Sequence, residues 1–95
     1  DCSGLIQNIM QMKNINFPRD TDMQEDFCTR SILRKNLKAG DLVFWKGHVA
    51  LMTQKNRIIH ANAFHMKTQE EALVTAEKRI FKTNGKVRKY ARIIS

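Results

Sequence analysis

Three short apolar segments near the middle of the chain constrain the fold most. They span residues 41–46, 48–53 and 57–61, and only Gly47 and a loop around Lys55 separate them. Apolar runs of strand length with such short connections pair as antiparallel neighbours, because a parallel pair needs a crossover of a dozen or more residues. The sequence therefore predicts an antiparallel meander at the centre of the fold.

Helical periodicity dominates the segment before the meander. The apolar residues that share one face of a 3.6-residue helix are Leu5, Ile6, Ile9 and Met10. This spacing predicts a helix over residues 2–13. A second, short helix is predicted to end near residue 28, with Asp20 or Thr21 as its N-terminal cap.

The chain after the meander is predicted to add two strands and a helix. A short strand is expected over residues 64–70, helical spacing continues to about residue 81, and a final strand follows over residues 87–94. The polar stretch 29–38 carries no predicted element. The order of elements indicates an α+β fold in which N-terminal helices pack on an antiparallel sheet that is covered on one side.

Length and composition fit one small domain. A chain of 95 residues normally closes around a single core, and 42% hydrophobic with 27% charged residues exclude a disordered chain. The longest apolar runs are far shorter than the ~20 residues that cross a bilayer. We therefore expect residues 1–95 to form a single domain without a membrane span.

The net charge of +8 is concentrated at the C-terminal end. Residues 78–95 contain seven Lys and Arg and no acid. Such asymmetry favours a solvated basic face or adhesion to an anionic polymer. Tyr90 is the only aromatic among these charges and no recognition motif accompanies it, so a specific nucleic-acid partner is not expected.

The residues best suited to chemistry are one cysteine and two histidines. Cys2 begins the first predicted helix, where the helix N-terminus and a nearby imidazole lower a thiol pKa and populate the nucleophilic thiolate. His48 opens one predicted strand and His60 lies near the end of the next, and histidine exchanges protons near neutral pH. Cys28, in contrast, is interpreted as a small buried hydrophobic residue.

The loop between the two histidine strands decides whether their side chains share a face. Successive side chains alternate across a sheet, so an odd loop of residues 54–56 would place Ala50 opposite His60 and both histidines on one face. We predict this odd loop, with the first helix lying across the same face and bringing Cys2 to the histidines.

A metal site is not expected. Structural zinc usually uses close pairs of ligands, such as two cysteines separated by two to four residues, and no such cysteine pair exists here. With only two cysteines, at most one disulfide is possible, and the redox compartment stays open.

Five motifs resemble, in order and spacing, the NlpC-like cell-wall cysteine peptidases of bacteria. They read DCSGLI at residues 1–6, PRDTDMQ at 18–24, LKAGDLVFW at 37–45, GHVAL at 47–51 and IHA at 59–61. The resemblance implies a papain-like core without a cofactor and hydrolysis of amide bonds in peptidoglycan stem peptides, with γ-D-glutamyl-diamino acid bonds as the expected class. It also implies that Cys2 is the nucleophile, His48 the general base and acid, and His60 the orienting residue.

The same resemblance extends to substrate binding and to the surroundings of the domain. It places Asp1, Ser3 and Thr21 along the substrate pocket, and His65 is expected on the surface or at the substrate. Family members have further sequence before the cysteine, often with an SH3-like domain, so a domain truncated before the nucleophile is expected. Such a protein would act in the bacterial cytoplasm, in peptide recycling, or in the cell envelope. The alternative is a catalytically idle module that binds peptidoglycan or another anionic polymer.

Overall fold

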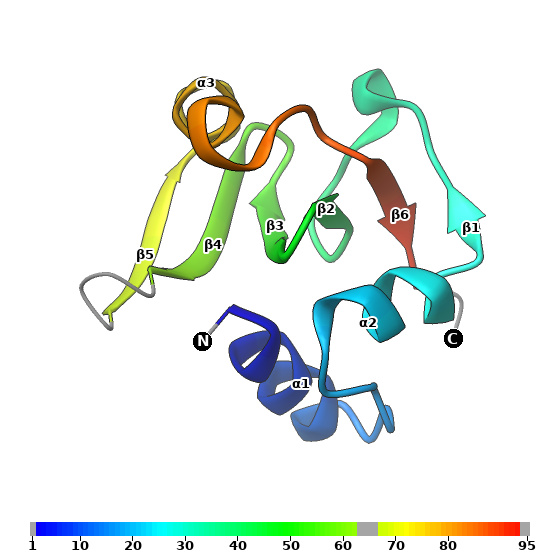
Figure 1. Ribbon diagram of the computed structural model, residues 1–95. Coiled ribbons are helices and arrows are strands. Elements are labelled where there is room, and N and C mark those ends of the chain that lie inside the picture. The colour runs from blue at the N-terminus through cyan, green and yellow to red at the C-terminus, as the bar shows by residue number, and fades with distance from the viewer. Residues whose placement is uncertain (1, 63–66, 94–95) are drawn as a thin grey trace.

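The computed structural model describes residues 2–62 and 67–93 and has the predicted α+β architecture (Figure 1). The helices are α1 (Cys2–Met12), α2 (Thr21–Phe27), the 3-10 turn η1 (Arg34–Asn36) and α3 (Leu73–Asn84). The strands are β1 (Arg30–Ser31), β2 (Leu42–Trp45), β3 (His48–Gln54), β4 (Arg57–Asn62), β5 (Lys67–Ala72) and β6 (Lys89–Arg92). Among the described residues, no helix is long and apolar enough to cross a bilayer.

The strands form one antiparallel sheet in the order β1-β6-β2-β3-β4-β5. The predicted meander is confirmed and extends through β5. The C-terminal strand β6 returns to the other edge of β2, where Ala91 lies opposite Leu42. Both β1 and η1 fall in the polar stretch 29–38, for which the sequence predicts no element. The sequence gives no signal there because β1 consists of two exposed residues without apolar alternation and η1 has no buried residue.

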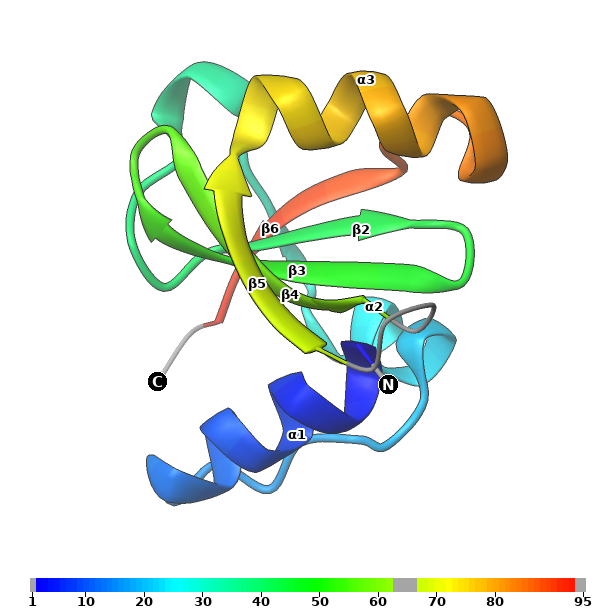
Figure 2. The same cartoon turned by 90° about the vertical axis from the view of Figure 1, so that its left-hand side faces the viewer.

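The sheet is covered on both faces, so the prediction of a sheet covered on one side is wrong. Figures 1 and 2 show α1 and α2 on one side of the sheet and α3 on the other. Alternate residues of the central strands enter the two separate cores. Leu42, Phe44, Val49 and Leu51 pack with α1, and Val43, Trp45, Ala50 and Met52 pack in the core that also contains Leu73, Ala76 and Ile80 of α3.

The central strands therefore need no polar face. All four residues of β2 are buried, as are four consecutive residues of β3, Val49 to Met52. A continuous apolar run is typical of a strand with protein on both sides. The unbroken apolar run at residues 42–45 thus indicates a strand that is covered by protein on both faces of the sheet.

The connection between β3 and β4 differs from the predicted odd loop. Gln54 pairs with Arg57, which leaves a two-residue turn, but a β-bulge shifts the register between Met52 and Gln54. The extra residue of the bulge restores the parity that an odd loop would have given, since Leu51 lies opposite Ile59 and Met52 opposite Ile58. The predicted shared face of the two histidines is confirmed, by a bulge and not by an odd loop.

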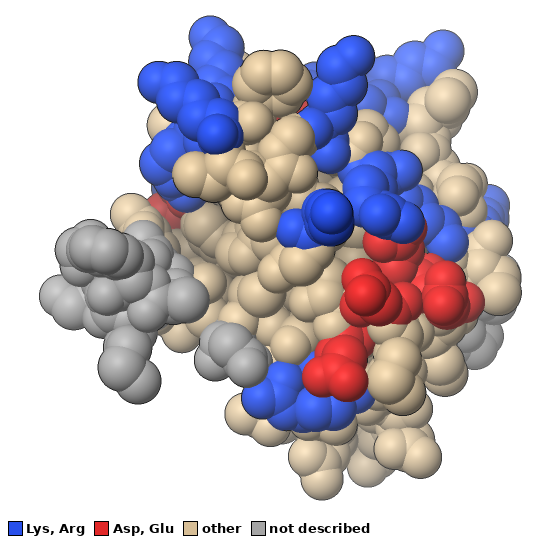
Figure 3. Space-filling model, viewed as in Figure 1, with Lys and Arg blue, Asp and Glu red and all other residues tan. Residues whose placement is uncertain are grey.

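The basic C-terminal segment is not a uniform solvated face. Arg92 forms an ion pair at 2.8 Å with the buried carboxylate of Asp41, and Arg88 lies 3.2 Å from Glu25 of α2. Figure 3 shows acidic side chains bordered by Lys and Arg on one face of the molecule. Part of the excess positive charge therefore holds β6 against its neighbours.

Candidate active site

Cys2 lies at the N-terminus of α1, where the helix reaches the end of the sheet. Its side chain is buried, at 9% exposure, and its Sγ lies 4.0 Å from the carbonyl oxygen of Gly47. Gly47 belongs to the turn between β2 and β3, has a φ of +74°, and directly precedes His48. The left-handed backbone of this turn suits glycine and allows the tight reversal next to the thiol. Cys2 is therefore brought beside the start of β3.

His48 and His60 form a contact between adjacent strands. Nε2 of His48 lies 2.9 Å from Nδ1 of His60, and the ring centroids are 5.1 Å apart in an edge-to-face arrangement. The indole ring of Trp45 lies against His48, with centroids 5.5 Å apart. His60 is buried at 2% exposure, whereas His48 is only partly buried at the strand end. The two rings are thus linked through one nitrogen each, and the contact does not use Nδ1 of His48.

The prediction that α1 lies across the face of the two histidines is wrong. Both histidines follow the alternation of Ala50 and Ile58, whose side chains pack in the core on the α3 side, while Val49 packs with α1. Cys2 therefore belongs to one layer and the histidines to the other. The layers approach each other at the β2–β3 turn, where Cys2 contacts Gly47.

The histidine pair continues into a carboxylate that the sequence analysis missed. Nε2 of His60 lies 2.5 Å from Oε2 of Glu71 on β5, and Arg79 of α3 donates to both carboxylate oxygens at 2.5 and 2.7 Å. Glu71 lies opposite Ile58 in the β4–β5 ladder, on the face of His60. Extending the predicted strand 64–70 to this register would have placed Glu71 beside His60.

Burial and neighbouring charge set the protonation of this network. Loss of solvent lowers the pKa of His48 from 6.5 to about 4, and electrostatic interaction with His60 and Arg79 lowers it in the same direction, against a smaller opposing effect of Glu71. The pKa of Glu71 is lowered below 4.5, chiefly by its hydrogen bonds from Arg79. Near neutral pH the site therefore holds a neutral His48 and an ionised Glu71.

Ser3 lies next to Cys2 and is held by the segment around α2. Nη1 of Arg19 donates to Oγ of Ser3 at 3.0 Å, and Nε2 of the buried Gln24 donates to its carbonyl oxygen at 2.9 Å. Thr21, the first residue of α2, is buried one turn before Gln24. Asp20 and not Thr21 precedes the helix as its cap residue, without a side-chain capping bond.

Two residues singled out in the sequence are outside the described part of the chain. They are Asp1, which was predicted to bind substrate, and His65, which was expected on the surface or at the substrate.

The second cysteine, Cys28, is buried in the same apolar core as Cys2, and both cysteines are free thiols. Burial raises the pKa of Cys28 from 9.0 to about 11, against a smaller lowering effect of Lys89. A thiol that stays protonated at neutral pH is a poor nucleophile, which agrees with its interpretation as a buried hydrophobic residue.

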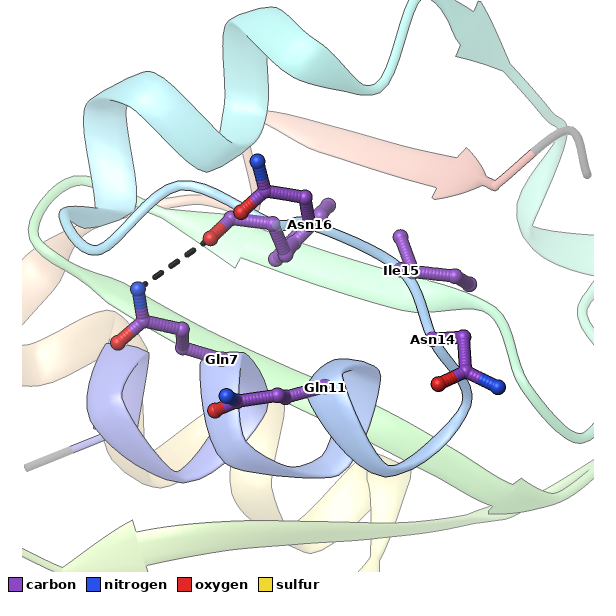
Figure 4. A pocket seen from close by; sticks show the side chains of 6 residues that line it. Gln7, Gln11, Asn14, Ile15 and Asn16 are labelled. Carbon is purple, nitrogen blue, oxygen red and sulfur yellow. Dashed lines mark hydrogen bonds between the residues drawn. The ribbon is translucent and has the colours of Figure 1, made fainter.

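In the described part of the chain, neither a metal-ligand cluster nor the hollow beside α1 offers a second catalytic site. Within residues 2–62 and 67–93, no group of three or more His, Cys, Asp or Glu side chains is placed to hold a metal ion. A surface hollow of about 340 Å³ beside the C-terminal half of α1 is lined by Gln7, Gln11, Asn14, Ile15, Asn16 and Phe17 (Figure 4). Its lining residues include no acid, base or nucleophile, so it does not compete with the Cys2 and His48 region as a catalytic site.

Comparison with known proteins identifies related sequences. The sequence model of the NlpC/P60 family matches residues 1–84. Dipeptidyl-peptidase 6 of Lysinibacillus sphaericus is 34% identical over 62 residues, which cover 65% of this chain and 23% of that protein. The murein DD-endopeptidase MepS/murein LD-carboxypeptidase of Escherichia coli K12 is 32% identical over 68 residues, covering 65% of this chain and 36% of that protein.

Solved structures agree with the fold. An NLP/P60-family protein of Staphylococcus aureus subsp. aureus Mu50, described as similar to a lipoprotein, aligns over 100% of this chain and 32% of its own, with a TM-score of 0.77 and 30% identity. The chain thus spans well under two thirds of the length of these relatives.

Proposed function

Because the chain belongs to the NlpC/P60 family, we propose that it is a cysteine peptidase that hydrolyses amide bonds in peptidoglycan stem peptides. The names of two relatives support this proposal: a dipeptidyl-peptidase supports peptidase activity, and a murein DD-endopeptidase supports the substrate class. The bond we propose is that between γ-D-glutamate and a diamino acid. We propose that residues 1–95 form a single peptidase domain.

One observation carries the catalytic assignment. Sγ of Cys2, at the N-terminus of α1, lies beside Gly47, and the next residue, His48, is linked at 2.9 Å to His60. A nucleophile, a base and a group that orients the base are the three parts that acyl transfer needs. We assign these roles to Cys2, His48 and His60.

The proposed reaction proceeds through a thioester. Nδ1 of His48 takes the thiol proton of Cys2 as the sulfur attacks the amide carbonyl, and the same proton passes to the departing amine as the C–N bond breaks. Water then attacks the thioester and gives a proton to His48. That proton returns to sulfur as the carboxylic acid leaves, while backbone amides of the first turn of α1 stabilise the oxyanion.

The substrate-binding roles are proposed for Asp1, Ser3 and Thr21. The hydrogen bonds from Arg19 and Gln24 to Ser3 support these roles. They tie the first turn of α1 to the segment around α2, which contains Thr21, close to the thiol of Cys2. A pocket wall built from both segments would hold the stem peptide next to Cys2.

The test is hydrolysis of a γ-D-glutamyl-diamino acid peptide by the purified chain, followed by chromatography of the released amine. We expect turnover in the wild type and none above background in Cys2→Ala, with Cys28→Ala as the matched control. If the wild type is folded and inactive but is retained on insoluble peptidoglycan, the chain is a binding module and the proposal is wrong.

A further inference from the structure

We propose that Glu71, held by Arg79, is a positioning residue that determines which ring nitrogens of His60 and His48 carry protons. The inference rests on the proposed function for its catalytic meaning, since it concerns the residue assigned as the base. In structural terms, His48 donates a hydrogen bond to His60, and His60 donates one to Glu71.

The chain of contacts is continuous and crosses three strands and a helix. Nε2 of His48 meets Nδ1 of His60 at 2.9 Å, Nε2 of His60 meets Glu71 at 2.5 Å, and Glu71 receives two bonds from Arg79. Because the His60 ring uses both of its nitrogens, it transmits the polarity of one contact to the other. The contacts therefore cannot be assigned independently.

The donors and acceptors follow from Glu71. A carboxylate paired with a guanidinium is ionised and only accepts hydrogen bonds, so Nε2 of His60 must carry a proton. In a neutral ring Nδ1 of His60 then has none and accepts from Nε2 of His48. A neutral His48 protonated at Nε2 has an unprotonated Nδ1, which is the state that a general base for Cys2 requires.

Burial makes this assignment strict. His60 is 2% exposed and the Glu71 side chain 11%, so water has little room to replace either partner. A buried polar atom that faces another donor instead of an acceptor loses a hydrogen bond without compensation. The titratable groups that act on His48 are those of this network, namely His60, Glu71 and Arg79.

A second carboxylate on the α3 side of the sheet offers a matched control. Glu77 of α3 receives hydrogen bonds from Arg34, the shortest at 2.6 Å, and one from the hydroxyl of Tyr90 at 2.6 Å. It has the same type of arginine pair and a second donor, but no histidine. A variant of Glu77 therefore shows the effect of losing an arginine-bound carboxylate alone, and a variant of Glu71 shows the added effect of losing the bond to His60.

The first experiment is ¹⁵N NMR of the imidazole nitrogens of the wild-type chain at pH 8. We expect His60 and His48 both in the Nε2–H tautomer. A proton on Nδ1 of either ring under these conditions overturns the inference. This measurement needs no variant and so does not depend on the folding of one.

The second experiment reverses the donor while keeping an ion pair. In Glu71→Lys/Arg79→Glu the lysine ammonium only donates, so Nε2 of His60 must accept and its proton moves to Nδ1. Nδ1 of His60 then donates to Nε2 of His48. The proton of His48 therefore sits on Nδ1, where it prevents His48 from acting as the base. We expect kcat to fall about 10²-fold or more with KM changed less than threefold, since a general base contributes roughly 10²–10⁴. Glu71→Gln, which can offer an oxygen or an NH₂ to His60, should fall between this variant and the wild type, and Glu77→Gln should keep wild-type kcat.

The outcomes separate the inference from the proposed function. If the double variant is folded and keeps wild-type kcat and wild-type iodoacetamide labelling of Cys2, Glu71 does not position the base and the inference is wrong. If the wild type has the expected tautomers but hydrolyses no stem peptide, the inference about Glu71 stands and the peptidase assignment fails.

Discussion

The two cysteines of this chain are both buried, both free and both part of the core that packs with α1, yet Cys2 begins a helix and Cys28 follows the end of one. Cys2 begins a helix and contacts the turn that leads into His48. Cys28 follows the end of α2, packs in an apolar core, and has a pKa raised to about 11. Because both thiols are buried, the proposed difference in reactivity rests on the neighbouring helix end and imidazole.

The largest expected difference is in activity. Cys2→Ala removes the proposed nucleophile and should lower kcat by roughly 10⁴-fold or more, as loss of a nucleophile does in other acyl-transfer enzymes. Cys28→Ala should keep kcat within about threefold, because it removes only a core contact. Peptide hydrolysis followed under saturating substrate checks both, and equal losses in the two variants would contradict the distinction.

The next expected effect concerns what makes Cys2 reactive. If His48 accepts its proton, His48→Gln should slow iodoacetamide labelling of Cys2 at pH 7 by about tenfold or more. Labelling of Cys28 should stay slow in both proteins. Mass spectrometry of the two cysteine peptides separates the rates. Unchanged labelling of Cys2 in the variant would show that His48 does not activate it.

Much of this site could be predicted from the sequence, and the missed parts share one cause. Local signals indicated the helix that begins at Cys2 and the strands that carry His48 and His60, because apolar periodicity is a property of neighbouring residues. Pairing across the sheet is not such a property. The bulge before Gln54 and the register that sets Glu71 beside His60 depend on contacts between segments.

The covering of the second face was missed for the same reason. Helical spacing predicted the helix that became α3, but nothing local says which side of the sheet a helix takes. The contact of Glu71 with Arg79 exists only once α3 lies over the histidine face. Charge counting alone assigned Arg79 to a basic surface.

The histidine network should also make stability depend on acid pH. The folded pKa of His48 is about 4 and its ordinary value 6.5, so its contribution is complete above pH 6.5 and is lost as the pH falls toward 4. Within this window the free energy of unfolding should fall by up to about 1.4 kcal/mol per pH unit from this group. Urea unfolding at pH 7 and pH 5 measures the slope.

His48→Gln is the variant that isolates this effect. It should flatten the dependence between pH 6.5 and 4, whereas Cys28→Ala should leave it as in the wild type. An identical slope in wild type and His48→Gln would mean that His48 titrates in the folded protein as it does in the unfolded chain.

The smallest expected effect lies at the other end of the pH scale and belongs to Cys28. Its folded pKa of about 11 exceeds the ordinary value of 9.0, so the unfolded thiol ionises first as the pH rises. The stabilising contribution is therefore complete below pH 9 and is lost between pH 9 and 11. Cys28→Ala removes this thiol and keeps the other groups of the chain, Tyr90 included. The wild type should lose stability more steeply than Cys28→Ala from pH 8 to pH 10. Parallel curves for wild type and Cys28→Ala would show that the core does not keep this thiol protonated, and the contrast with Cys2 would then rest on His48 alone.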